Sequence, residues 1–264
     1  MRAGRPSFAM LLVGVLAVGW SGQALAATPP SQAPNGTAAS PRATEQPGSA
    51  GFPTPEDAIR HYMAGVAQAD VSKILEASAI GEMSTGFRFD LLADRLKAFV
   101  FPSSLAPADY PFYADMNRTL QSARILSQVQ MLAYSLLSSE RMDGSVIAPV
   151  DKARADAFVQ AVDPARLAGL TVADIRFSNA RFEHDTRYLA NAAAMATIYG
   201  ADELTERLVL LSFDGKYYDI GFTLLRYGGD WKVSSQVANL AGTNALGAAQ
   251  PTTIEGFDLM TSGD

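Results

Sequence analysis

The 264-residue chain contains no cysteine, so it forms no disulfide bond, thiolate metal site or lipid-modified cysteine. It has two histidines, which leaves few candidates for imidazole chemistry. It also lacks the Gly-x-Ser-x-Gly nucleophile elbow, the Gly-x-x-x-x-Gly-Lys phosphate loop, the Gly-x-Gly-x-x-Gly nucleotide motif and the His-Glu-x-x-His zinc motif. The sequence therefore gives no positive ground for catalysis, and we expect neither a cofactor nor a metal ion.

Long apolar runs are also missing, except near the N terminus. Arg2 and Arg5 precede an apolar run at residues 9–20, and Ala24-Leu25-Ala26 follows it. This is the pattern of a secretory signal peptide, so we predict cleavage after Ala26 and export to the periplasm or the extracellular space. The run is shorter than the roughly 20 apolar residues that span a membrane, although an uncleaved anchor is the alternative. We predict no membrane span after signal cleavage.

An excess of positive charge is absent as well. The signal holds two of the 21 basic residues and none of the 27 acidic ones, which leaves 19 against 27 and a formal charge of −8. This acidic balance argues against nucleic acid and anionic membranes as partners. Residues 27–51 are rich in Pro, Ala, Ser and Thr and predict a disordered linker. We expect a single domain at residues 52–240 and a flexible tail at 241–264.

The first half of this domain is predicted to be helical. Thr54 and Pro55 are typical of a helix start, because the hydroxyl caps free amides and proline has no amide to leave unpaired. Asp70 is expected to cap a short second helix, and further helices are expected at residues 90–99 and 151–162. The side chains expected to face the core are Ile59, Tyr62, Met63, Val66, Leu91, Leu92, Leu96 and Phe99.

The longest periodic segment, residues 112–139, predicts one amphipathic helix. Its apolar stripe comprises Met116, Leu120, Ala123, Leu126, Val129, Leu132, Ala133 and Leu136. Its polar side comprises Arg118, Gln121, Arg124, Gln128 and Gln130. We interpret it as a helix packed on its own domain, with a partner-binding or membrane-active helix as the alternative.

The second half is rich in strands. Strands are predicted at residues 171–177, 208–213, 216–227 and 231–237, with a helix at 186–199. Asp214-Gly215 predicts a two-residue hairpin turn. The apolar row of the second hairpin strand comprises Tyr218, Ile220, Phe222 and Leu224. This row needs cover from the upstream helices, so we predict an α+β domain, its helical N-terminal half packed on an antiparallel sheet of about four strands.

The order of these elements, and the segment Tyr-Gly-Gly-Asp-Trp-Lys-Val at residues 227–233, resemble a known family. They are similar to the nuclear transport factor 2-like (cystatin-like) cone domains, and most of all to exported bacterial members without an assigned activity. The resemblance covers residues 178–240 best and the longer helical half poorly. It implies a curved sheet wrapped around a long helix, often with a pocket, and no single activity.

Asp219 is an acid that could bind a polar group of a ligand in such a pocket. It lies in mid-strand, on the face opposite the apolar row, together with Tyr217 and Tyr227. The simpler interpretation of Asp219 is a solvated acid on the outer face. Tyr217 and Tyr227 are then cross-strand partners rather than residues of a pocket rim. Nearby, Asp202, Glu203 and Glu206 are interpreted as solvated surface.

The histidines give two further candidates. His184 lies in Glu183-His184-Asp185, which is either an acid–base or metal site at a strand-to-helix junction or the cap of the next helix. His61 is expected to face away from the core and to pair with Asp57, one turn before it. We expect Asp219, Tyr217, Tyr227 and His184 as the ligand-binding residues, with no catalytic residue among them.

The sequence thus favours an exported, non-catalytic domain that binds a small ligand or an envelope protein. One alternative is an exported hydrolase or isomerase that uses Asp219, or Glu183, His184 and Asp185, in a pocket. The other is a structural assembly subunit held through the long helix, and a homodimer would be compatible with it.

Overall fold

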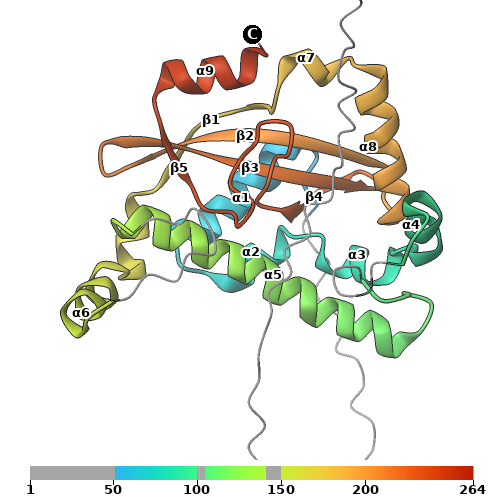
Figure 1. The fold of residues 1–264 in the computed structure, drawn as a ribbon, viewed down its shortest axis with the longest axis horizontal. Helices are drawn as coiled ribbons and strands as arrows, with labels where there is room; N and C mark the ends of the chain where they lie inside the picture. The colour runs from blue at the N-terminus through green and yellow to red at the C-terminus, as the bar shows by residue number, and fades with distance from the viewer. Residues whose placement is uncertain (1–50, 100, 102–104, 141–149, 264) are drawn as a thin grey trace, which may run out of the picture. The chain divides into compact units, whose positions relative to one another are not determined.

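A computed structural model describes residues 51–99, 101, 105–140 and 150–263 of the chain (Figure 1). The predicted signal peptide, and the linker up to its last residue, lie outside these described residues. Residues Ala50–Asp264 form one unit, which contains the helices as well as the sheet.

Helices dominate the first half and strands the second. The elements are α1 (Pro55–Ala67), α2 (Val71–Glu76), α3 (Ile80–Gly86), α4 (Phe89–Leu96), α5 (Pro111–Leu137), α6 (Lys152–Ala161), the 3₁₀ helix η1 (Pro164–Gly169), β1 (Thr171–Phe177), α7 (Ala180–Glu183), α8 (Thr186–Ile198), β2 (Glu203–Phe213), β3 (Lys216–Tyr227), β4 (Asp230–Ser235), β5 (Gln250–Thr252) and α9 (Ile254–Ser262). The α+β class predicted from the sequence is confirmed.

Capping residues start the helices where the sequence places them. The Thr54 side chain accepts a hydrogen bond from the Asp57 amide, and Pro55 opens α1. Asp70 caps α2 in the same way, through the Lys73 amide. These short-range contacts satisfy helix amides that have no partner inside the helix.

The sheet is antiparallel, in the order β1-β2-β3-β4, and β5 pairs with β3 beyond the end of β4. Asp214 and Gly215 both have positive φ, 47° and 71°, and join β2 to β3 by the predicted two-residue turn. The outer edge of β4 is closed by backbone hydrogen bonds to Phe52, Ala77 and Ala79, each of 2.8 Å. These bonds leave β4 no open edge at which another strand could pair.

The main core lies between α1 and one face of the sheet. Ile59, Tyr62, Met63 and Val66 of α1 are buried, as their spacing predicts. They pack against the inner face of the sheet, where the Tyr62 ring meets Phe222 edge-to-face at 5.5 Å. The apolar row of β3 is therefore sheltered by the upstream helices, as predicted.

Helix α5 also covers this face, but the prediction of its buried stripe is partly wrong. Met116 and Leu120 are exposed, whereas Asn117, Gln121 and Gln128 are buried. The reason is that two of these amides have partners. Asn117 exchanges hydrogen bonds of 2.9 Å with the backbone of the segment before α5, and a buried amide with partners carries little penalty.

Gln128 belongs to a buried network that joins α1, α5 and β4. The Tyr62 hydroxyl donates to Gln236 Oε1 at 2.5 Å, and Gln236 Nε2 donates to the Gln128 carbonyl at 2.9 Å. Gln128 in turn donates to Ser235 Oγ at 2.9 Å and accepts from the Gln236 amide at 3.0 Å. The network fixes how α5 is rotated over the sheet.

Two further expectations are corrected. The helix predicted at residues 90–99 is α4 (Phe89–Leu96), and Leu96 and Phe99 are exposed rather than inward. The tail predicted to be flexible forms β5 and α9, and Phe257 of α9 is buried against Leu208 and Leu210 of β2.

The physical reason for the ordered C terminus is that β2 is apolar on both faces. Residues 208–211 are a run of four aliphatic side chains, so both faces of this strand need cover. In Figure 1, α9 accordingly lies on one side of the sheet and α5 on the other. The sheet is the middle layer of the domain.

Candidate functional site

The four predicted ligand-binding residues are not brought together. Tyr217 and Tyr227 lie ten residues apart on β3, which corresponds to roughly 33 Å along an extended strand. His184 is exposed at the C-terminal end of α7, and Asp219 is buried in the sheet. No single pocket can therefore use all four.

The Glu183-His184-Asp185 segment caps a helix, which was the alternative to a site in the sequence analysis. Asp185 accepts hydrogen bonds from the amides of Arg187 and Tyr188, at 2.9 and 2.8 Å, and so caps α8. The acid is turned toward the helix start rather than toward an acid–base partner.

The expected pairing of His61 is wrong. Its Nε2 atom lies 3.2 Å from Glu76 Oε2, across the α1–α2 pair, and its ring lies 4.8 Å from the Phe52 ring. Asp57 instead accepts from the Thr54 hydroxyl at 2.6 Å, because both belong to the helix start.

The two tyrosines have separate surroundings. Tyr217 is exposed and lines a shallow depression of about 470 Å³ with Pro251 and Ile254. Tyr227 is half-buried and donates to the Tyr199 carbonyl at 3.1 Å. Burial raises the pKa of the Tyr227 hydroxyl, so it stays protonated and acts as a donor.

Asp219 is the predicted residue with the most unusual surroundings. Only 4% of it is exposed, so it is not a solvated acid on an outer face. Its Oδ1 atom has no hydrogen-bond partner among the described residues, and burial raises the carboxyl pKa from 3.8 to about 6. Asp219 lines neither the depression beside Tyr217 nor a second one beside Arg176.

Glu206 was interpreted as solvated surface, and that interpretation is wrong. It is buried in β2, where Oε2 accepts from the Leu240 amide at 2.9 Å and from Ser178 Oγ at 3.4 Å. Burial raises the pKa of this carboxyl despite the amide hydrogen bond. Glu206 holds the segment after β4 onto the outer face of the sheet.

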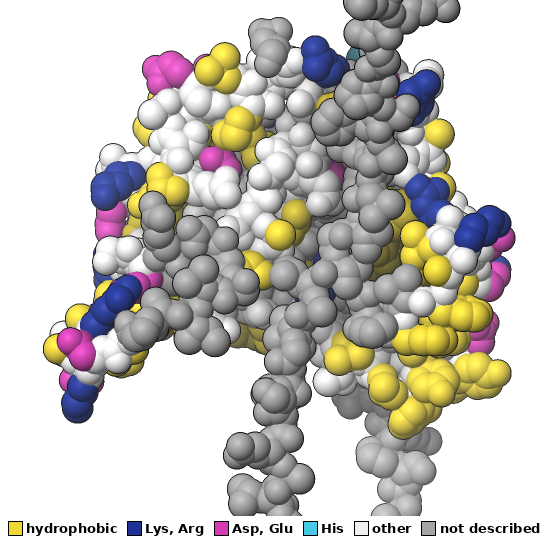
Figure 2. Space-filling view, viewed as in Figure 1, with side chains coloured by type: hydrophobic (Ala, Val, Ile, Leu, Met, Phe, Trp, Pro, Cys, Tyr) yellow, Lys and Arg dark blue, Asp and Glu magenta, His cyan; other side chains and the backbone are white. Residues whose placement is uncertain are grey.

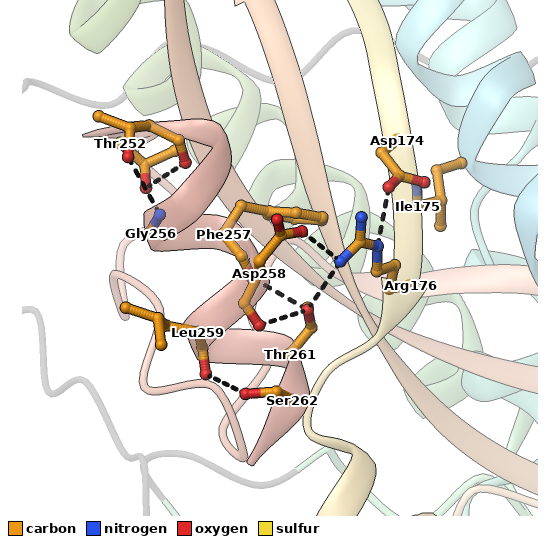
Figure 3. A network of polar contacts seen from close by, with 11 residues as sticks. Asp174, Ile175, Arg176, Thr252, Gly256, Phe257, Asp258, Leu259, Thr261 and Ser262 are labelled. Atoms are coloured by element: carbon orange, nitrogen blue, oxygen red, sulfur yellow. Dashed lines mark hydrogen bonds and ion pairs between the residues drawn. The ribbon is translucent and has the colours of Figure 1, made fainter. Parts of the chain in front are cut away.

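A depression of about 540 Å³ is lined by residues of β1, α7 and α9, and Figure 3 shows the polar contacts between β1 and α9 beside it. Arg176 is its central polar group. Its Nε donates to Asp174 at 2.8 Å, and one terminal nitrogen donates to Asp258 at 2.6 Å and to Thr261 at 3.3 Å. The guanidinium also lies 5.0 Å from the centre of the Phe257 ring. Two carboxylates already neutralise this arginine, so the network fastens α9 to β1 rather than awaiting an anion.

The most unusual surface of the domain is apolar. Large apolar side chains stand exposed around the end of α4 and the start of α5, where Figure 2 shows hydrophobic side chains gathered. We call this set the aromatic surface: Leu96, Phe99, Phe101, Tyr110, Phe112, Tyr113, Met116 and Leu120. The exposed fractions of Phe99, Phe101 and Phe112 are 67%, 70% and 70%.

The rings of this surface are ordered against one another. Phe99 and Phe101 stack with Phe89 of α4 at centroid distances of 5.3–6.3 Å and interplanar angles of 11–14°. Tyr113 contacts the rings of Tyr110 and Phe112 at 5.9 and 5.5 Å. Stacked rings lose little further freedom when another molecule covers them.

The summed exposed area of these eight side chains is large for a monomer. With roughly 200 Å² for each large side chain, the exposed fractions amount to about 900 Å². The largest apolar patch on a soluble monomer is typically about 300–600 Å². Sequence reasoning missed the surface, although two aromatic clusters around Pro102, Pro107 and Pro111 were a signal for it.

Metal and membrane sites gain no support within the described ranges. No three His, Asp or Glu residues there are grouped so that they could hold a metal ion. In the same ranges, no helix combines the length and apolarity that a membrane crossing needs.

Comparisons with known proteins bear on the fold. No protein-family model and no curated protein matches the chain. A solved structure of a cystatin-like protein from Ruminococcus gnavus is similar, with a TM-score of 0.52 and 16% sequence identity. The match covers 75% of this chain and 44% of that protein, so this chain spans less than half of the other's length. The chain therefore has the cystatin-like α+β cone fold that the sequence resemblance implies.

Proposed function

We propose that this chain is an exported, non-catalytic domain that binds another protein molecule in the cell envelope through the aromatic surface. Export rests on the signal-like residues 1–26 and on the linker composition of residues 27–51. Binding rests on one observation, the exposed aromatic surface of about 900 Å². Aromatic residues and methionine are the types enriched where proteins bind one another.

A protein partner fits the structure better than a small ligand does. Small-molecule sites are concave cavities that enclose most of the ligand. In this domain α1 fills the inner face of the sheet with Ile59, Tyr62 and Met63, each of them buried. The rings of the aromatic surface are instead exposed to solvent, where another protein can cover them.

The test compares two multiple variants. The aromatic-surface variant carries Phe99→Ser, Phe101→Ser and Phe112→Ser, and the control variant carries Val159→Ser and Leu259→Ser. Both remove side chains that are about 70% exposed, so neither opens a cavity in the core. Each variant and the unmodified protein would be immobilised and incubated with envelope extract that contains a tagged copy of the chain.

We expect the unmodified protein and the control variant to retain the same protein and the aromatic-surface variant to lose it. Equal retention by all three would contradict the proposal. Export is tested separately by N-terminal sequencing of the exported chain. A mature chain that begins at Ala27 supports cleavage, and retention of the chain in the cytoplasm contradicts it.

Asp219 is the observation that favours the alternative, a hydrolase or isomerase. A buried carboxyl with an unpaired oxygen and a pKa of about 6 is suited to proton transfer. Such a role requires that a substrate reach Asp219. Reaction of the folded protein with a water-soluble carbodiimide and an amine tests this, because labelling of Asp219 would support access and complete protection would contradict it.

A further inference from the structure

We infer that the partner of the aromatic surface is a second copy of this chain, so that the protein is a dimer joined through α4 and the start of α5. The inference rests on the proposed function, because it names the molecule that covers the same surface. It makes the chain an assembly subunit in which the exposed part of the long helix is an interface.

The area of the surface matches what a dimer needs. A stable interface of standard size buries about 800 Å² on each partner. The exposed aromatic surface supplies about 900 Å² on one chain, nearly all of it from apolar side chains. A two-fold pairing of such surfaces covers both copies at once and leaves no second apolar face open.

The charges beside the surface favour a copy over a charged partner. Asp94 and Lys97 flank Leu96 and form an ion pair of 2.7 Å. Asp115 and Arg118 flank Met116 and pair at 2.9 Å. Each pair presents both signs, and the exposed Arg95 and Asp109, which adjoin Leu96 and Tyr110, add one charge of each sign, so the charges of these six residues cancel.

A neutral border has consequences for the choice of partner. It gives no attraction to anionic lipid headgroups, which basic residues normally supply. In a two-fold dimer, each acidic group on one copy can instead meet a basic group on the other. The charge beside the surface and its area therefore both favour a second copy of this chain as the partner.

The experiment is sedimentation of the purified protein over a range of concentrations, with the two multiple variants defined above. We expect the unmodified protein and the control variant to form dimers in reversible equilibrium with monomer. The dissociation constant of the aromatic-surface variant should rise at least about thirtyfold, which corresponds to the loss of one hot-spot side chain. Circular dichroism identifies any variant that fails to fold.

A second measurement uses the absence of cysteine and leaves every aromatic residue in place. Met116→Cys and Leu259→Cys each give the chain a single thiol, at an exposed position inside and outside the surface. A short bismaleimide should couple two copies of the Met116→Cys protein and leave the Leu259→Cys protein largely uncoupled. Equal coupling of both would overturn the inference.

Three other outcomes would also overturn it. The first is a protein that stays monomeric at about 100 µM, because the dissociation constant of any dimer would then lie above that concentration. The second is a dimer that the aromatic-surface variant does not weaken. The third is a monomer that binds neutral or anionic lipid vesicles through this surface.

The failure of the inference and of the proposed function remain distinguishable. A monomer that retains a different envelope protein through the aromatic surface overturns the dimer and supports the proposed function. A monomer whose aromatic-surface variant retains the same proteins as the control overturns both.

Discussion

Replacement of Asp219 by asparagine should make the protein more stable at neutral pH. The carboxyl is buried, one of its oxygens is unpaired, and its pKa is raised from 3.8 to about 6. Asparagine has nearly the same shape and cannot ionise. The variant therefore removes the penalty of a buried charge and leaves the packing largely unchanged.

The sign and size of the effect follow from proton linkage. Because the pKa of Asp219 is higher in the folded chain than the ordinary 3.8, the folded state binds the proton more tightly. The stability from this group is complete below about pH 4 and is lost as the pH rises through 6. A shift of about two pKa units corresponds to about 3 kcal/mol at pH 7 and above.

The assay is urea unfolding of both proteins from pH 4 to pH 8 at one fixed protein concentration. The fluorescence of Trp231 reports the transition, because this side chain is buried against the core. The stability of Asp219→Asn relative to the unmodified protein should increase by about 2.5 kcal/mol between pH 4 and pH 7. Glu255→Gln, which removes an exposed carboxylate from α9, is the matched control.

A difference between the two proteins that does not change with pH would refute the reasoning. It would mean that the Asp219 carboxylate is solvated or paired in solution. A decrease in the relative stability of the variant with rising pH would refute it more strongly, because ionised Asp219 would then stabilise the fold.

Three further substitutions test the buried polar contacts and the cover of the sheet. Glu206→Ala should destabilise the fold by about 1–3 kcal/mol because it leaves the half-buried Leu240 amide without its acceptor. Glu206→Gln should lose less, and equal losses would contradict this role. Gln236→Ala should lower the free energy of unfolding by about 2–4 kcal/mol, because it leaves the fully buried Tyr62 hydroxyl unpaired. A loss under about 0.5 kcal/mol in urea unfolding would show that water replaces the amide. Gly221→Ala should destabilise by at least about 2 kcal/mol, because its Cβ would lie 2.3 Å from a backbone nitrogen of the segment that covers β3; an unchanged melting temperature would place that segment elsewhere.

The features that could be predicted from the sequence depend on neighbours along the chain. Thr54 and Asp70 cap the helices that follow them, and Asp214-Gly215 makes the predicted hairpin turn. The alternation of β3 likewise indicates which of its side chains face the core. In each case the physical cause lies within a few residues, so the local pattern is sufficient.

The features that were missed depend on residues far away in the chain. Gln128 is buried because Ser235 and Gln236, more than 100 positions later, supply its partners. Asp219 and Glu206 are buried because the C-terminal segment covers the outer face of the sheet. Polarity alone assigns such residues to the surface, since the partners that permit burial are invisible in a local pattern.

The aromatic surface was missed for the opposite reason. Helical periodicity assigned Met116 and Leu120 to the core, and Phe99 was expected to face inward. The structure instead buries Asn117 and Ile125 of α5 and leaves those apolar side chains exposed. An apolar stripe indicates that a helix face needs to be buried, but it does not indicate whether the residues that bury it belong to the same chain or to a partner.

Whether another protein covers the aromatic surface in living cells is the central question, and a photo-reactive phenylalanine analogue placed at position 112 tests it most directly. The same analogue at position 259, which is exposed to a similar extent on α9, is the control. We predict that irradiation of cells yields a covalent adduct with a protein from position 112 and none from position 259, and that mass spectrometry finds a second copy of the chain in it. Adducts from neither position, or equally from both, would contradict the account.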